Sequence, residues 1–285
     1  MKPSVALIGP GKLGCSVARR LQDAGYPFAA VISRDLSRAQ EACDFVGCEP
    51  NLASVQLSDA GKAQIILLAV PDDQLEAQAK ALQSCAHLSA EQTLVHFSGL
   101  HPAALMRQKT SASQLLSIHP LLPFANRQLA VEKLSGCPCA LEGDSVALAL
   151  GEQLITDIGG KPFAIASDKK ALYHASACIA SNYLVTLLGT ARDLLGQCGI
   201  DPEQAIPLLL PLVQASLDNT GQLGPEAGLT GPIVRGDRGT VQQHLRALAE
   251  AAPELLSLYR LLGEKTLELA VKSGRLPEEQ AKNLL

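Results

Sequence analysis

The chain has 285 residues, 47% of them hydrophobic and 18% charged, which is typical of a soluble globular protein of about two domains. Its formal net charge is -4, and no basic run interrupts the sequence, so nothing indicates a nucleic-acid partner. Only a short apolar run precedes Gly9, less than a secretion signal needs. We therefore expect a cytoplasmic protein that binds small molecules, with neither nucleic acid nor membrane as a partner.

A glycine-rich motif lies close to the N-terminus. The apolar run at 5–8 leads into Gly9-Pro10-Gly11-Lys12-Leu13-Gly14, and a helical pattern follows. In this setting G-x-G-x-x-G supplies a tight turn, a close approach to a diphosphate and close packing of helix on strand. An ordinary glycine-rich turn is the alternative, but the flanking strand and helix favour a dinucleotide site.

The second predicted strand, at 28–32, ends at Ser33-Arg34, where the adenosine ribose lies in such sites. A hydroxyl and a guanidinium suit a ribose 2'-phosphate, so we expect NADP rather than NAD. The carboxylate of Asp35 would oppose a 2'-phosphate if it faced the ribose. We expect it instead to cap the following helix. The expected cofactor-binding residues are Gly9, Gly11, Lys12, Leu13, Gly14, Ser33, Arg34, Val70 and Pro71.

Apolar runs at 65–70, 93–97 and 115–118 alternate with helical segments, which predicts a Rossmann-type, doubly wound α/β domain with a mostly parallel sheet. Ligands of such sheets bind at the carboxyl ends of the strands. Ser98 and His119, which follow or end two of these runs, are therefore expected to face one crevice.

After short predicted strands near 139–141 and 162–165, every periodic segment is helical. We expect a Rossmann NADP-binding domain at 1–166 and an all-α domain for substrate binding and dimerisation at 167–285. Asp201-Pro202 and a capping box at Thr240 predict later helix starts.

The stretch 171–191 has no charged side chain and is about as long as a membrane-spanning helix. Its polar residues, among them Tyr173, His174 and Asn182, favour a buried helix in a soluble protein instead.

The chain also has eight cysteines without paired C-x-x-C knuckles, so we expect buried, reduced thiols and no metal site.

Several longer segments carry a family resemblance. The resemblance rests on the glycine motif, on Ser33-Arg34 and on five longer segments. These segments are AVPD at 69–72, HFSGLHP at 96–102, SIHPLLPF at 117–124, YHASACIASNYLV at 173–185 and GLTGPIVRGD at 228–237. The chain resembles predicted NADP-dependent oxidoreductases with a Rossmann-like domain and a helical C-terminal domain of unknown function. Fold relatives of that family include pyrroline-carboxylate reductase, 6-phosphogluconate dehydrogenase and prephenate dehydrogenase. The resemblance implies a nicotinamide site in the interdomain cleft and a homodimer.

The chain departs from the related hydroxyacid dehydrogenases at one position. Those enzymes place a catalytic Lys three residues before an Asn; here Asn182 matches, but Ile179 stands at the Lys position. A simple hydroxyacid dehydrogenase mechanism is therefore unsupported. We expect an NADP(H)-dependent oxidoreductase acting on a small polar, anionic metabolite, and the alternative is a non-catalytic dinucleotide-binding sensor or scaffold.

Hydride transfer to a carbonyl or imine needs a proton donor beside the reacting heteroatom. His119 is our first candidate, and a turn histidine bonded to local backbone is the alternative. On one helical face, His174 and Asn182 either orient substrate or form a polar core or subunit interface. Ser98 is a candidate for binding the nicotinamide or the substrate. The expected catalytic residues are His119, His174, Asn182 and Ser98.

The segment TGPIVRGD at 230–237 interrupts the helical half. Its glycines and Asp237 are explained by a rigid connector that caps the next helix. Arg235 beside Thr230 is not explained by a connector, so we expect these two residues to bind a substrate carboxylate or phosphate.

Overall fold

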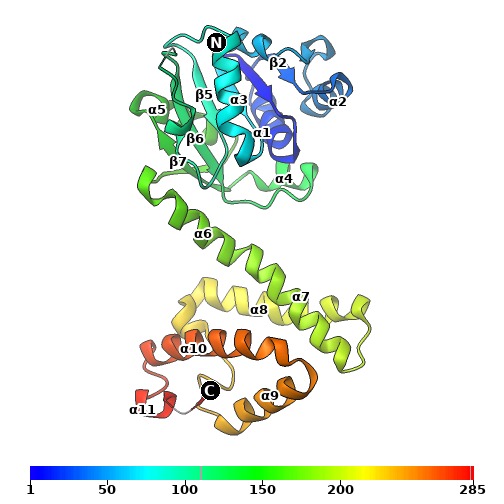
Figure 1. The fold of residues 1–285 in the computed structure, drawn as a ribbon, viewed down its shortest axis with the longest axis vertical. Helices are drawn as coiled ribbons and strands as arrows, with labels where there is room; N and C mark the ends of the chain where they lie inside the picture. The colour runs from blue at the N-terminus through cyan, green and yellow to red at the C-terminus, as the bar shows by residue number, and fades with distance from the viewer. Residues whose placement is uncertain (110, 283) are drawn as a thin grey trace. The chain divides into compact units, whose positions relative to one another are not determined.

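The computed structural model describes residues 1–109, 111–282 and 284–285. Contacts divide the chain into two compact units, Met1–Ser181 and Asn182–Leu285, and Figure 1 labels their helices and some of the strands. The first unit contains the sheet and its helices, and the second is helical.

The sheet of the first unit has eight strands in the order β3-β2-β1-β4-β5-β6-β7-β8. All neighbouring strands are parallel except β6 and β7, which are antiparallel. The predicted Rossmann-type, mostly parallel sheet is therefore confirmed. The strands are β1 Val5–Ile8, β2 Phe28–Ile32, β3 Ala53–Ser54, β4 Ile65–Leu68, β5 Thr93–His96, β6 Gln114–Pro120, β7 Pro138–Gly143 and β8 Lys161–Ala164.

Helices cover both faces of this sheet. In β1, Val5 and Leu7 join one hydrophobic core, and Ala6 and Ile8 join the other, because successive strand residues point to opposite faces. The first core includes residues of α1, α2 and α5, and the second includes residues of α3. This two-sided burial explains why the strands are continuous apolar runs. The helices are α1 Lys12–Asp23, α2 Leu36–Val46, α3 Asp72–Cys85, α4 Arg127–Lys133, α5 Ser145–Asp157 and α6 Lys170–Ala180 (Figure 1).

Helix α6 belongs to the first unit, which extends to Ser181 and so past the boundary that we expected near residue 166. The reason is that Lys170, Tyr173 and His174 on its first turns contact residues at the ends of the sheet strands. The helix is also interrupted at Ser181. The helical face that we expected His174 and Asn182 to share is consequently divided between α6 and α7.

The second unit consists of helices around a small core. Asp201 caps α8 by accepting a hydrogen bond from the Glu203 amide at 2.8 Å, as predicted. Of the two caps that the sequence offered for α9, Asp237 and the capping box at Thr240, the structure has Asp237, whose carboxylate accepts from the Thr240 amide at 3.1 Å. The helices are α7 Asn182–Gln197, α8 Pro202–Gly228 with a kink at Gly224, α9 Arg238–Ala251, α10 Leu256–Lys272 and α11 Glu278–Ala281.

One helical stretch, Ser167–Gln197, is long and apolar enough to cross a membrane by length and composition alone, with a mean hydropathy of 1.2. None of its most apolar window is buried in the chain. Leu172 is 74% exposed, Ile179 62% and Val185 69%. The expectation of a buried core helix is therefore wrong for the single chain, since these side chains are exposed among the residues that the structure describes.

The eight cysteines are free thiols. Four of them are buried, but Cys85 and Cys198 are exposed, so the expectation of buried thiols holds for only part of the set. Among the residues with described positions, no three His, Cys, Asp or Glu side chains gather as they would to hold a metal ion.

Candidate active site

The glycine-rich loop follows β1 and has the geometry of a diphosphate-binding turn. Gly9 has φ +82°, and a Cβ there would lie 2.7 Å from the carbonyl oxygen of Ala69. A Cβ on Gly14 would lie 2.8 Å from the Gly9 carbonyl oxygen, whereas one on Gly11 would meet nothing within 4 Å. The first and third glycines thus allow close backbone packing, and the second leaves open space at the N-terminus of α1, where anions bind favourably.

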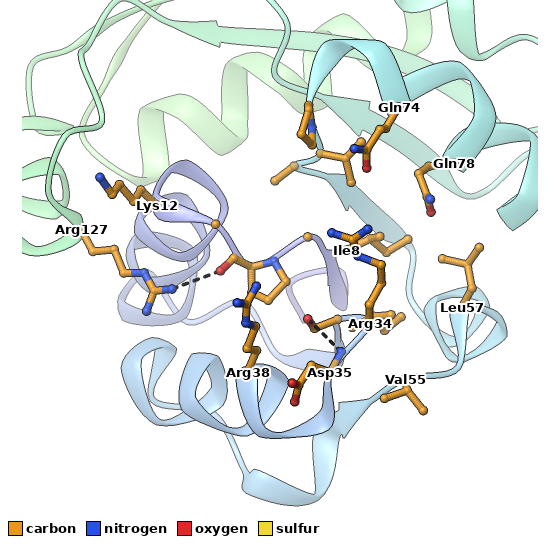
Figure 2. Close-up of a pocket in the computed structure, with 18 residues that line it drawn as sticks. Ile8, Lys12, Arg34, Asp35, Arg38, Val55, Leu57, Gln74, Gln78 and Arg127 are labelled. Atoms are coloured by element: carbon orange, nitrogen blue, oxygen red, sulfur yellow. Dashed lines mark hydrogen bonds between the residues drawn. The ribbon is translucent and has the colours of Figure 1, made fainter.

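A cavity of about 570 Å³ lies beside this loop. Of the expected cofactor residues, Leu13 and Gly14 do not line it; Leu13 packs against the core and Gly14 is buried. The cavity also contains Arg38, Gln74, Gln78 and Arg127, which the sequence analysis did not select (Figure 2). The expected residues that do line it are Gly9, Gly11, Lys12, Ser33, Arg34, Val70 and Pro71.

The cationic side of the cavity lies between β2 and α2. Arg34 and Arg38 line it and are exposed. The carboxylate of Asp35 accepts hydrogen bonds from the amide and the hydroxyl of Ser37, both at 2.8 Å, and these bonds lower the pKa of Asp35. Asp35 is therefore the predicted cap of α2, and its charge is used by its own helix rather than directed at a 2'-phosphate.

A further cation comes from α4. Arg127 donates to the carbonyl of Pro10 at 3.3 Å and to Glu41 at 2.9 Å, and the first of these bonds is drawn in Figure 2. Arg127 and Pro10 are 117 positions apart. No local pattern marks such a pair, which explains why the sequence analysis missed Arg127.

Ser98 lies at the end of β5 and holds a turn together. Its hydroxyl donates to the carboxylate of Asp72 at 2.8 Å and accepts from the amides of Leu100 and His101 at 3.1 and 3.0 Å. The single hydroxyl hydrogen and both lone pairs are therefore in use. Asp72 follows Pro71, which lines the cavity, so this turn connects the cofactor cavity to the next strand ends.

Lys170, the first residue of α6, is only 1% exposed. Its ammonium group donates to the Ser117 hydroxyl at 2.7 Å and to the Ser98 carbonyl at 3.1 Å, and burial lowers its pKa. A buried amine is retained when hydrogen bonds offset its desolvation, so Lys170 fixes the ends of β5 and β6 relative to α6. The sequence analysis missed it, although a lysine opening an apolar helix was a usable signal.

His119 ends β6 and pairs with a tyrosine. Its Nδ1 lies 2.7 Å from the hydroxyl of Tyr173, and its ring centroid lies 5.8 Å from that of His174 at an interplanar angle of 84°. Burial, together with the nearby His174 and Lys170, lowers the pKa of His119 to about 4. The imidazole is therefore neutral near pH 7. The structure brings His119, His174 and Ser98 together, and it adds Tyr173, which the sequence analysis did not select.

Gly99 lies against both imidazoles. A Cβ at this position would come within 2.6 Å of Cδ2 of His174 and 2.8 Å of Nε2 of His119. A side chain would thus cover Nε2, and glycine leaves this nitrogen uncovered. Nε2 makes no hydrogen bond to the residues that the structure describes, so it is free to bond a ligand.

The remaining predicted residues lie in the second unit. Asn182 opens α7 and is exposed, as are Thr230 and Arg235. Gly231 and Gly236 have φ values of +109° and +67°, so the segment between α8 and α9 is a shaped loop, as expected. The roles of Asn182, Thr230 and Arg235 stay predictions.

A doubly wound parallel sheet with a G-x-G-x-x-G loop and a cationic cavity defines a dinucleotide-binding protein of the Rossmann class. Residues 4–98 match the family described as NADP oxidoreductase, coenzyme F420-dependent, and residues 137–266 match a domain of unknown function. The N-terminal part of the chain is therefore similar to this NADP oxidoreductase family and the later part to that C-terminal domain. Its cofactor is NADP, as predicted.

Solved structures agree with this fold. A candidate NADP oxidoreductase from Bacteroides fragilis is 21% identical with a TM-score of 0.76, and the match covers 94% of this chain and 98% of the other. A protein from Thermotoga maritima is 27% identical with a TM-score of 0.75, covering 95% and 100%. The 1-pyrroline-5-carboxylate reductase of Streptococcus pyogenes is 18% identical with a TM-score of 0.65, covering 95% and 99%. A search of curated proteins found no match.

Proposed function

We propose that the protein is an NADP(H)-dependent oxidoreductase that transfers hydride between the cofactor and the carbonyl or imine carbon of a small polar metabolite. One observation carries the proposal: His119 presents an uncovered Nε2 at the sheet edge where the cavity also lies. The ends of β1, β4, β5 and β6 share this edge because these strands are parallel. A sensor would bind the dinucleotide without needing this imidazole.

The four expected catalytic residues have distinct roles in this proposed reaction. When bound, the cofactor supplies or accepts the hydride. His119 gives a proton to the reacting oxygen or nitrogen, and His174 orients the same atom. Ser98 acts as a positioning residue, since its hydroxyl is committed to Asp72 and to two backbone amides. Asn182 is proposed as a further substrate-orienting side chain.

The proposed substrate carries a carboxylate or phosphate, held by Arg235 and Thr230. An exposed guanidinium in a loop shaped by two glycines of positive φ supports this role, because Arg binds such groups with charge-assisted hydrogen bonds. Arg235 makes no salt bridge to the residues whose positions are described. Its charge is therefore available to a ligand.

Mass spectrometry of co-purified ligand, followed by NADPH oxidation with small keto and imino acids, tests the proposal. We expect Arg235→Ala to raise KM about 10-fold or more for anionic substrates, as loss of a charge-assisted bond predicts. Esters of the same acids, which lack the charge, should be much less affected. Arg246→Ala removes another exposed arginine of the second unit and serves as the matched control. Unchanged KM in Arg235→Ala would reduce the loop to a connector.

The alternative function is a non-catalytic sensor or scaffold that binds the dinucleotide. It predicts tight NADPH binding, no oxidation with any carbonyl or imine compound, and an altered conformation or partner affinity when NADPH is present. That set of results would replace the enzyme proposal.

The chain is proposed to form a homodimer through its helical part. Apolar side chains on α7 and α8 support this, among them Val185 at 69%, Leu208 at 61% and Leu212 at 66% exposure. Such side chains are rarely left in water over a wide surface. Light scattering at micromolar concentration should give a dimer, and Val185→Glu should shift it toward monomer. Val146→Glu, at a site 71% exposed on α5, is the control and should not. A monomer that partitions into lipid vesicles would instead favour a membrane contact.

A further inference from the structure

A neutral imidazole is a poor proton donor when it acts alone. Loss of its N–H hydrogen would leave an imidazolate, so the other ring nitrogen must gain a proton at the same time. In His119 that other nitrogen is Nδ1, which lies 2.7 Å from the Tyr173 hydroxyl. The question is which of these two groups carries the hydrogen between them.

The hydrogen-bond inventory favours one direction. A phenol has one O–H to donate, and the Tyr173 hydroxyl has His119 as its hydrogen-bond partner among the residues that the structure describes. If Nδ1–H donated instead, the partly buried phenol would lose its acceptor, which is costly. We therefore assign the shared hydrogen to the Tyr173 hydroxyl, which then donates to Nδ1, and place the imidazole hydrogen on Nε2, the nitrogen beside Gly99.

We propose that Tyr173 and His119 form a two-proton relay, with Tyr173 as the positioning residue that supplies the second proton. The inference rests on the proposed function. As hydride adds to the substrate carbon, Nε2–H passes its proton to the reacting oxygen or nitrogen, and the Tyr173 O–H passes its proton to Nδ1. The imidazole stays neutral, and the starting state is restored when solvent protonates Nε2 and Nδ1 returns its proton to the phenolate. In the oxidative direction both protons move in reverse.

The relay starts from two neutral groups. Burial raises the pKa of Tyr173 to about 12 and lowers that of His119 to about 4, so both groups are neutral near pH 7. The tyrosine ring is also held in place, since Phe163 lies edge-on to it at 6.2 Å between centroids. The imidazole of His119 is perpendicular to the tyrosine ring, at 5.4 Å.

The first test uses the protein without substrate. NMR of ¹⁵N-labelled histidines, with His119→Asn for assignment, should show His119 with the hydrogen on Nε2 and a hydrogen-bonded Nδ1. Tyr173→Phe should produce a mixture of the two tautomers. The second unit holds a matched control, because the Tyr259 hydroxyl lies 2.8 Å from Nδ1 of His244: Tyr259→Phe should change the resonances of His244 and leave those of His119 unaltered. A hydrogen on Nδ1 of His119, or an unchanged tautomer in Tyr173→Phe, overturns the relay.

The second test measures turnover with a keto or imino acid that the native protein reduces. We expect Tyr173→Phe to lower kcat about 10- to 100-fold, with NADPH affinity unchanged. The dependence of kcat on the deuterium content of the solvent should indicate two protons in transit for the native protein and one for the variant. An equal kcat in both would overturn the relay while leaving the proposed function intact. If the native protein reduces no such compound, the proposed function fails, and the NMR result alone decides the hydrogen-bond direction.

Discussion

Replacing His119 with asparagine is expected to lower kcat by about 100-fold or more, the usual effect of losing a general acid. An asparagine keeps a hydrogen-bonding group near Nδ1 for Tyr173 but has no counterpart of Nε2, the uncovered nitrogen beside Gly99. The melting temperature should change little, because the imidazole is only partly buried. Steady-state kinetics and a thermal melt measure the two effects.

The pH dependence gives a second check on His119. The folded pKa is depressed to about 4 by burial and by His174 and Lys170, while Asp72 acts in the opposite direction. The neutral, Tyr173-bonded form therefore prevails above about pH 4 and is lost only as the pH falls through that value. The native profile of kcat/KM should keep its activity well below pH 6.5, the ordinary histidine pKa. His174→Asn is the companion variant, and an unchanged kcat in both variants would return these histidines to a structural role.

Replacing Arg34 with alanine is expected to weaken NADPH binding about 10- to 100-fold, since a hydrogen bond to a charged group contributes about 1.5 to 3 kcal/mol. Arg34 lines the cavity beside Ser33, and the Asp35 carboxylate that follows is bound to Ser37 rather than opposing it. Arg38, in the first turn of α2, lines the same cavity. We expect Arg38→Ala to have a smaller effect in the same direction and the double variant a larger one.

NADH is the internal control for this prediction, because it lacks the 2'-phosphate. Its affinity should be lower than that of NADPH in the native protein and should change little in Arg34→Ala. Fluorescence titration or calorimetry gives both dissociation constants. If Arg34→Ala binds NADPH as well as the native protein does, the phosphate contact belongs to other residues, and Arg38 and Lys12 become the first ones to test.

Much of the first unit was predictable because its signals are local. The strands β1 and β2 have the predicted bounds, since an apolar run bounded by glycine or polar residues indicates a buried strand directly. Strand β3, Ala53–Ser54, was missed because two residues are too few to carry a pattern. In the second unit the sequence offered two caps for α9, Asp237 and Thr240, and only the structure selected Asp237, since both lie within one turn of the helix start.

The candidate site divides in the same way. Gly9, Gly11, Ser33 and Arg34 could be selected from the sequence, because each acts at a turn or strand end that its own neighbours define. Whether the apolar stretch at 171–191 is buried in a core could not be predicted from the sequence, since burial depends on which segments the fold places beside it. Val185 and Leu172, which we expected to be buried, are exposed in the structure.

The sequence by itself determined the alternation of strands and helices, the glycine turn and the capping role of Asp35, because each depends on residues within about one helical turn or one strand. Only the tertiary structure decided which side chains meet at the sheet edge. Tyr173 reaches His119 across 54 positions, and Lys170 reaches Ser117 across 53. Both contacts require the antiparallel pairing of β7 with β6 and the path of β8 into α6. A connection of more than fifty residues can adopt many conformations, so the sequence alone does not determine which residues it brings together.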